Sequence, residues 1–467
     1  MNRRQFLLTT GHGFGVVALS GLLEGSTINP LAPRPPHAAA KAKSIIYLFM
    51  HGGVSHVDTF DPKPELTKRS GEALSVELAK TIKTSFIHDP TKAVLRGSPW
   101  TFRPGGKSGL PVSDLFPKVR ECMDDIAVIR GCHGDVFDHA PAIYLRNTGS
   151  QFPGRPCLGS WVTYGLGTEN QNLPAFVVMS EGSMKSGPPA YGAGFLPAVY
   201  QGTAFRSGEN PVLYLKNPPS ISNEAQRDTL SFIDKMDRLH QASRSTDSTL
   251  EARIASYELA FRMQSAAPEV VDFNKETPAT QALYGIGNPL TDDFGRKCLL
   301  ARRLVERGVR FIQIYSGTTL GDDWDNAHTD LIASHTKMAG KTDHPIAGLL
   351  KDLKAHGLLD STLVVWSGEF GRTPLAQGQN GRDHHPYGFC AWMAGGGVKG
   401  GQALGATDEF GVRAAEMRVD AHDLNATLLR LMGMDHEKLT YFYQGRDQRL
   451  TDVHGQNEFT KRLLGVS

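Results

Sequence analysis

The sequence is poor in the features that by themselves define a class of protein. It has only 5 cysteines in 467 residues, without a Cys-x-x-Cys spacing, so it specifies neither a zinc ribbon nor a disulfide framework. Its formal net charge is only +2, which argues against nucleic acid or an anionic membrane as the main partner. Beyond residue 40, no segment approaches the ~20 consecutive apolar residues of a membrane-spanning helix. We therefore expect a small-molecule partner, no nucleic acid and no stable membrane span.

Glycine, proline and apolar residues are abundant instead. The chain contains 50 glycines and 27 prolines, and 40% of its residues are hydrophobic. This composition is typical of a globular protein with long ordered loops, and the length suffices for one large α/β core or for two domains.

The amino terminus has the pattern of a processing segment. Two arginines at 3–4 precede an apolar stretch that ends near Leu23, and three alanines stand at 38–40. This order resembles a twin-arginine signal peptide, and a short membrane anchor is the alternative. We predict a signal over 1–40 and a mature domain over 41–467. The protein would then use the twin-arginine export machinery and be periplasmic or otherwise exported.

Six apolar runs rich in β-branched and aromatic residues indicate buried strands. Between them, apolar residues spaced three and four apart indicate helices. This alternation predicts an α/β fold, with a mostly parallel sheet and helices on both faces. The predicted strands are 44–50, 126–129, 175–179, 309–315, 362–366 and 389–393, and the predicted helices are 297–307, 346–356 and 423–432.

One polar, helix-forming stretch interrupts the alternation. Between residues 222 and 263, apolar residues form two stripes that start at Leu230 and Leu250. The pattern predicts an inserted helical hairpin over about 220–265, which we interpret as a lid or cap.

Histidines and carboxylates gather at four places beside the ends of predicted strands. Such positions are where an α/β sheet carries its chemistry. Imidazole and carboxylate ligands without thiolate suit Zn, Mn, Fe or Ca. Alternatively, these groups form hydrogen-bonded networks that hold long loops against the sheet. The residues concerned are His51, His56, Asp58 and Asp61; His133, Asp135, Asp138 and His139; Asp322, Asp323, Asp325 and His328; and Glu369, Asp383, His384 and His385.

Several motifs resemble one family of exported bacterial proteins. The segments 368–374, 381–384, 394–401 and 450–455 read Gly-Glu-Phe-Gly-Arg-Thr-Pro, Gly-Arg-Asp-His, Ala-Gly-Gly-Gly-Val-Lys-Gly-Gly and Leu-Thr-Asp-Val-His-Gly. Together they look like the domain of unknown function 1501. Their order after a first strand is similar to that of the alkaline-phosphatase superfamily. The resemblance covers the mature chain and implies an alkaline-phosphatase-like core.

The resemblance also implies where metal ligands lie. His51 stands in the place of an acid after the first strand. Glu369 keeps the acid of a later Asp-His pair, and Phe370 replaces its imidazole. We expect one or two divalent ions, Zn, Mn or Ca. One site would use Asp325, His328 and His384, a weaker second site would use His51, Glu369 and His139, and His56, Asp58 and His385 are reserves.

His139 falls where related sulfatases have their nucleophile, so the usual serine, threonine or cysteine is absent. Imidazole can attack covalently, act as a general base or bind the metal. Arg372 and Arg382 are candidate forks for an anionic ester, because guanidinium pairs bidentately with phosphate or sulfate. Pairing with nearby Asp or Glu is the alternative for both.

Two functions follow from these residues. The first is an exported metal-dependent hydrolase of phosphate or sulfate esters, acting on a small anionic ester or a sulfated polysaccharide with His139 as the catalytic residue. The second is a non-hydrolytic, metal-stabilised binding or scaffold protein of the cell envelope. Fold alone does not decide between them, since one fold hosts many activities.

Overall fold

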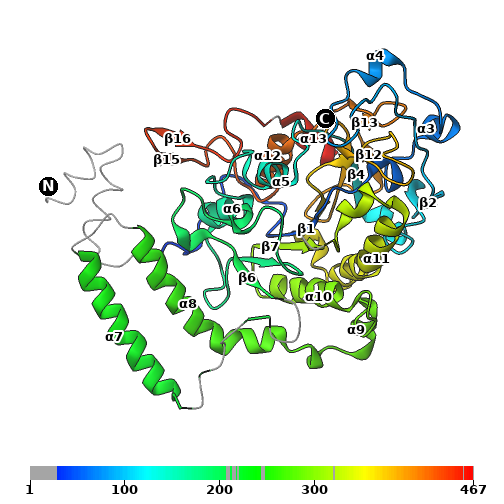
Figure 1. The fold of residues 1–467 in the computed structure, drawn as a ribbon. Coiled ribbons are helices and arrows are strands. Elements are labelled where there is room, and N and C mark those ends of the chain that lie inside the picture. Colours follow the sequence, from blue (N-terminus) through cyan, green and yellow to red (C-terminus); the bar gives the residue numbers. More distant parts are fainter. Residues whose placement is uncertain are drawn as a thin grey trace.

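The computed structural model describes residues 29–206, 211–212, 217, 220–242, 248–318, 321–455 and 457–465. At its centre is one large sheet, made of β1 (Ser44–Met50), β4 (Ile126–Cys132), β5 (Phe176–Met179), β6 (Thr203–Phe205), β7 (Phe311–Ser316), β8 (Thr362–Ser367), β11 (Phe389–Ala394) and β12 (Gln402–Leu404). Their spatial order is β12-β4-β11-β8-β1-β7-β5-β6, and Figure 1 labels β12, β4, β1, β7 and β6 of this sheet. All neighbours pair in parallel except β11, which runs antiparallel to β4 and β8.

Four short ribbons surround this sheet. They are β2 (Phe102–Gly105) with β3 (Leu110–Ser113), β9 (Gly371–Arg372) with β10 (His384–His385), β13 (Ala406–Thr407) with β14 (Ala414–Glu416), and β15 (Tyr441–Tyr443) with β16 (Arg446–Gln448). The ribbon of β9 and β10 matters most for function, because it pairs Arg372 with His384.

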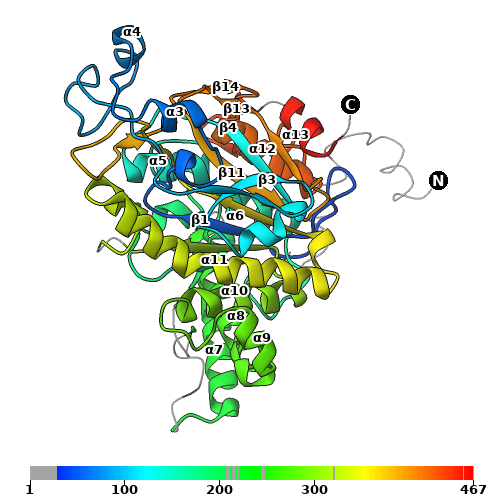
Figure 2. The same cartoon turned by 90° about the vertical axis from the view of Figure 1, so that its right-hand side faces the viewer.

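Helices cover both faces of the sheet (Figure 2). One face packs against α10 (Asp292–Glu306), α11 (Leu331–Ala355) and the end of α8 (Ser248–Val271). The other packs against α5 (His139–Thr148), α6 (Leu158–Leu166), α12 (Ala421–Leu431) and α13 (Asn457–Leu463). The remaining helices are α3 (Pro64–Lys68), α4 (Val76–Ala79), α7 (Asn223–Ala242) and α9 (Pro278–Leu283).

Strand β1 shows why its sequence is apolar throughout. Successive side chains of a strand point to opposite faces, so a strand covered on both sides buries every residue. All seven residues of β1 are buried. Its alternate residues enter two separate cores: Ile46, Leu48 and Met50 face α10 and α11, whereas Ile45, Tyr47 and Phe49 face α6 and α12.

The predicted α/β class is confirmed, with all six predicted strands in the main sheet, and the three predicted helices correspond to α10, α11 and α12, each predicted one residue too long at its carboxyl end. Strands β6 and β12 were not predicted. Each has only three residues and lies at an edge of the sheet. Such short segments carry too little of the alternating pattern to be recognised.

The carboxyl ends of β1, β4, β7 and β8 lie at one edge of the sheet, because these strands run parallel to one another. The antiparallel strand β11 begins at the same edge. The segments after β1, β4, β7 and β8, and the ribbon before β11, are therefore brought together. These segments carry the four clusters of histidine and carboxylate.

The inserted helical hairpin is confirmed as α7 and α8, which project from the body (Figures 1 and 2). The end of α8 is anchored in the core by Met263, Ala267 and Val270. On α7, by contrast, Phe232 and Met236 are 64% and 51% exposed. Its role as a lid stays a prediction.

The described chain begins with residues 29–42, which are buried at Leu31 and Ala42 and exposed over residues 35–41. Leu31 is buried in the same core as α6 and α12. The amide of Ala38 donates to the carbonyl of Gly433, and the amides of Lys41 and Ala42 donate to that of Leu431. The predicted boundary at residue 40 falls within this exposed stretch and stays a prediction. The paired arginines of the predicted signal lie outside the described residues.

All five cysteines are buried, unpaired thiols, so no disulfide joins them. Within the described part of the chain, none of the helices combines the length and apolarity needed to cross a bilayer.

Candidate functional site

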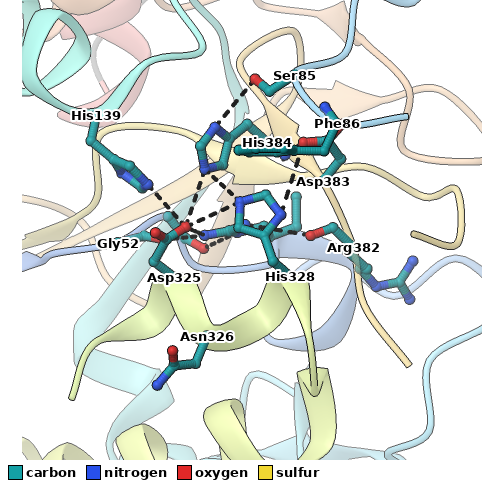
Figure 3. Close-up of polar contacts among 12 residues, drawn as sticks. Gly52, Ser85, Phe86, His139, Asp325, Asn326, His328, Arg382, Asp383 and His384 are labelled. Atoms are coloured by element: carbon teal, nitrogen blue, oxygen red, sulfur yellow. Dashed lines mark hydrogen bonds and ion pairs between the residues drawn. The ribbon is translucent and has the colours of Figure 1, made fainter. Parts of the chain in front are cut away.

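A short 3-10 turn after β7, Trp324–His328, places Asp325 and His328 side by side. The side chain of Asp323 caps the turn by accepting a hydrogen bond from the amide of Asp325. Residues three apart on such a turn face the same way. The Nε2 atom of His328 accordingly lies 3.2 Å from Oδ1 of Asp325 (Figure 3).

Two further imidazoles reach the same oxygen. Nε2 of His384, from β10, lies 3.1 Å from Asp325 Oδ1, and Nε2 of His139, at the start of α5, lies 2.9 Å from it. The Nε2 atoms of His328 and His384 are only 2.8 Å apart. Three imidazole nitrogens thus converge on one carboxylate oxygen (Figure 3).

The Nδ1 atom of each imidazole contacts a second polar group. Nδ1 of His139 lies 2.7 Å from Oε1 of Glu369, Nδ1 of His328 lies 2.5 Å from Oε1 of Gln377, and Nδ1 of His384 lies 3.4 Å from Oγ of Ser85. A carboxylate or amide oxygen at Nδ1 keeps the proton there and leaves a lone pair on Nε2. The Nε2 lone pairs of at least His139 and His328 therefore point toward Oδ1 of Asp325.

This donor set fits a divalent metal ion. Nε2 of His139 is buried without a hydrogen-bond partner of suitable geometry, although it lies beside Asp325. Facing lone pairs repel one another and the carboxylate, whereas a cation near them offsets this repulsion. Imidazole nitrogens together with a carboxylate oxygen suit Zn or Mn, whereas Ca prefers sites made of oxygen atoms alone.

Asp383 organises the site from the other side. Its Oδ2 accepts hydrogen bonds of 2.7 and 2.9 Å from the amides of Phe86 and Ile87, and its Oδ1 lies 4.0 Å from Nδ1 of His328. Together with His328 and His384, it forms a second possible group of ligand atoms. The ring of Phe86 packs edge-on against both imidazoles, 4.6 and 5.8 Å between centroids, and shields this side of the cluster.

The close approach of the turn to β1 requires glycine at position 52. Gly52 has φ +114°, and a Cβ atom there would lie 2.6 Å from the amide nitrogen of Asp325. Its own amide donates to Oε1 of Glu369 at 2.9 Å. The first Gly of the His-Gly-Gly motif therefore lets the two strand ends carry their ligands close together.

The residues predicted to form a second metal site, His51, Glu369 and His139, do not all face one point. Glu369 contacts His139, but Nε2 of His51 accepts a hydrogen bond from the amide of Lys185, 3.2 Å long. The ammonium of Lys185 lies between Oδ2 of Asp325, at 2.5 Å, and Oδ2 of Asp323, at 3.2 Å. A lysine thus occupies the neighbourhood where a second ion was expected.

Burial and charge shift the acidity of these groups in opposite directions. Burial lowers the pKa of His384 to about 3, with further lowering by Arg372. Burial also acts to lower the pKa of His139, but the neighbouring carboxylates of Asp325 and Glu369 outweigh it, and the net pKa is raised. Burial raises the pKa of Asp325, yet its three imidazole neighbours and Arg372 reverse this, so the carboxylate stays ionised.

The two arginines proposed to bind an anionic ester are used elsewhere, and this corrects the prediction. Both guanidinium groups are completely buried. Arg372 donates to the carbonyls of Gly52 and Gly53 and, at 2.8 Å, to Asp325 Oδ1. Arg382 forms a fork on Asp58, with distances of 2.8 and 3.2 Å. The structure therefore supports the alternative, pairing with nearby acids.

The reserve residues have structural partners. Asp58 pairs with Arg382, as described. His56 and His385 are buried and bond through Nε2 to the carbonyl oxygens of Gly411 and Val412. Because successive residues of β10 point to opposite sides, His385 faces away from the cluster that contains His384.

A cavity of about 270 Å³ is lined by the same two segments that carry His139 and His384. His133 and Asp135 precede His139, and Tyr387 follows His384. Arg413 and Arg418 complete its polar lining. A larger cavity of about 700 Å³ lies at the opposite edge of the sheet, where β1 and β8 begin, so size alone does not locate the chemistry.

Sequence reasoning missed Lys185, Gln377 and Ser85 as members of the site. Lys185 lies in a loop far along the chain from any cluster, and Gln377 and Ser85 carry no metal-binding signal of their own. The Asp-Asp-Trp-Asp run that contains Asp323 was the one sequence signal for the carboxylates that Lys185 contacts.

Comparison with known proteins places these features in context. The family model described as Protein of unknown function (DUF1501) matches residues 42–459. No curated protein matches the chain. The solved structure of Ps i-CgsB in complex with k-i-k-neocarrahexaose is similar over 91% of this chain and 77% of its own, with 10% identity and a TM-score of 0.41.

Two further solved structures are similar to this chain at comparable sequence identity and TM-score. The PsFucS1 sulfatase from Pseudoalteromonas sp. is 12% identical, with 90% of this chain and 72% of its own covered and a TM-score of 0.37. The alkaline phosphatase from the Antarctic bacterium TAB5 is 12% identical, with 84% and 98% covered and a TM-score of 0.35.

Proposed function

The chain belongs to the family of proteins of unknown function DUF1501, and we propose that it is an exported, metal-dependent hydrolase of sulfate or phosphate esters. The observation that carries the proposal is the convergence of three imidazole nitrogens on one oxygen of Asp325, each imidazole being held at its other nitrogen. Outer partners of this kind are typical of metal-binding histidines.

Asp325, His328 and His384 would hold one ion, with Gln377, Ser85 and Asp383 orienting them. A bound divalent ion supplies Lewis acidity, which stabilises negative charge on the ester in the transition state. The residues themselves exclude water and fix the geometry: side-chain exposure is only 15% for His328 and 5% for His384.

His139 serves as the general base in this proposal. Its Nδ1 donates to the buried carboxylate of Glu369, which fixes the tautomer and leaves the Nε2 lone pair available. Nε2 takes a proton from water while the water oxygen bonds to phosphorus or sulfur. The bond to the leaving oxygen breaks, and that oxygen receives the proton from His139. Glu369 stabilises the imidazolium that forms between the two steps.

Export by the twin-arginine machinery and a periplasmic location are part of the proposal. The paired arginines at 3–4 and the apolar stretch that follows support them. A sulfated polysaccharide or small anionic ester is the proposed substrate, because Arg413 and Arg418, which line the 270 Å³ cavity together with Asp135, can pair with an acidic group.

The competing function is a metal-stabilised scaffold without turnover. One observation favours it: Asp325 already bonds to the cations Arg372 and Lys185, so its negative charge is compensated within the protein. This function predicts that the chain binds a metal and hydrolyses no ester.

The variant His139→Ala distinguishes a general base at position 139 from a metal ligand. The protein is purified without chelator, its metal is measured by elemental mass spectrometry, and phosphate and sulfate esters are screened with that ion. A base at position 139 predicts unchanged metal content and a loss of turnover of at least about 100-fold. Loss of the metal would instead make His139 a ligand, and turnover that survives unchanged would overturn its catalytic role.

A further inference from the structure

Lys185 holds an unusual position for a lysine. Its ammonium bridges Oδ2 of Asp325 and Oδ2 of Asp323, at 2.5 and 3.2 Å, directly beside the three imidazoles. The side chain is 20% exposed, whereas that of Asp323 is only 2% exposed. Two acidic oxygens that face one cation in a buried position are the arrangement by which carboxylates hold a hard metal ion.

The backbone of Lys185 acts on the same region. Its amide donates to Nε2 of His51, so the lone pair of that nitrogen is already used. The proton of His51 must then lie on Nδ1, which is buried, has no hydrogen-bond partner among the described residues, and lies 3.8 Å from Oδ2 of Asp323. His51 therefore presents a donor to this space, and a protonated nitrogen cannot bind a metal.

We propose that Lys185 takes the place of a second divalent ion and makes the candidate site a one-ion site. The inference rests on the proposed function, because it needs the first ion to bind at Asp325, His328 and His384. The ammonium neutralises Asp323 and the outer oxygen of Asp325, as an ion bound there would. The latent site that it covers has oxygen donors and suits a hard cation such as Mn²⁺.

An unpaired polar atom beside the ammonium supports this inference. Oδ2 of Asp323, 3.2 Å from Nζ of Lys185, is buried without a hydrogen-bond partner among the described residues. Buried carboxylate oxygens normally find donors. Here the ammonium balances this oxygen by its charge, which is the role that an ion plays in a metal site.

The test counts ions. Wild type and Lys185→Met are saturated with Mn²⁺, freed of excess ion, and measured by native mass spectrometry and elemental analysis. We expect one ion per chain in the wild type and two in Lys185→Met, because methionine keeps the length of the side chain and removes its charge. The double variant Lys185→Met/Asp323→Asn should return to one ion.

Lys63→Met is the matched control. Lys63 is also largely buried, at 9% exposure, but it pairs with a single carboxylate, Asp61, at 3.0 Å. Removing its charge should leave one ion per chain. One ion in Lys185→Met, or two in the wild type, would overturn the inference and leave the proposed function standing.

No ion in any of the proteins would remove the proposed function and this inference together. The wild-type count needs no variant, so it tests the inference even where Lys185→Met does not fold.

Discussion

Nε2 of His328 lies 2.8 Å from Nε2 of His384, and both nitrogens lie within 3.2 Å of the same oxygen of Asp325. Two neutral imidazoles can share such a short contact only when one donates a proton to the other. Because His328 gives its proton to Gln377 at Nδ1, its Nε2 is the acceptor or, with a metal present, a ligand. Substituting His328 or His384 is therefore the most direct test of whether the site binds a metal.

His384→Ala should lower metal affinity by at least about 100-fold, since even outer partners of metal ligands contribute 10- to 100-fold. The measurement is metal content by elemental mass spectrometry after dialysis. His385→Gln is the matched control, because the neighbouring side chain points away and glutamine can still donate to the carbonyl of Val412. Equal metal content in both variants would remove His384 from the ligands.

Glu369→Gln should separate binding from turnover. Glutamine preserves the shape at Nδ1 of His139 but removes the charge that stabilises the imidazolium. We expect unchanged metal content, unchanged KM and a fall in kcat of about 10²- to 10⁴-fold. Loss of the metal in this variant would show that Glu369 is itself a ligand.

Arg418→Ala should weaken recognition of an acidic group next to the scissile ester. A hydrogen bond to a charged group is worth about 1.5–3 kcal/mol, so KM should rise about 10- to 100-fold. An uncharged ester should show no change. Arg446→Ala provides a comparison, because Arg446 is 55% exposed and lies 3.7 Å from Asp452. Equal changes for charged and uncharged esters would exclude the cavity as a subsite.

Asp58→Asn should destabilise the fold strongly. Asp58 and Arg382 are both fully buried, and removing one partner of a buried pair leaves an uncompensated charge at a cost of about 3–5 kcal/mol. Glu72→Gln, which removes the charge paired with the exposed Arg69, should cost less than about 1 kcal/mol. Chemical denaturation measures both.

Stability should fall as the pH drops below about 6.5. Burial lowers the pKa of both His56 and His335 to about 3 in the folded chain. The unfolded chain binds protons at its ordinary pKa of about 6.5, so acid favours unfolding until the pH reaches about 3. Each group contributes up to about 1.4 kcal/mol per pH unit within this window.

His335→Gln tests this slope, because its side-chain oxygen can still accept from the amide of Ser55, as Nε2 of His335 does. The variant should lose about half of the pH dependence of stability that His56 and His335 together cause. Denaturation is followed in chelator, so that metal binding does not add its own pH dependence. An unchanged slope would show that His335 does not titrate on unfolding.

The sequence was most informative where burial alone sets the pattern. The continuous apolar run of β1 predicted both a strand covered on two faces and the place of His51 at its end. Asp325 and His328, only three residues apart in the sequence, share one side of a turn, as a helical spacing allows. Both are local relationships, within a few residues of chain.

What could not be predicted depends on contacts between distant segments. Whether Arg382 would meet a substrate or Asp58 is decided by a pairing across 324 positions of chain. The approach of Lys185 to Asp325, across 140 positions, likewise follows from the path of one loop. Composition and spacing carry no information on either pairing.

The segment over residues 29–42 has a consequence for maturation. Proteases cut exposed stretches, and residues 35–41, which include the three alanines at 38–40, are exposed on the surface of the body. Cleavage after residue 40 would remove the anchor at Leu31 and the hydrogen bond from the amide of Ala38 to Gly433. The new amino terminus would then stay attached to the body through the contacts of Lys41 and Ala42 with the carbonyl of Leu431.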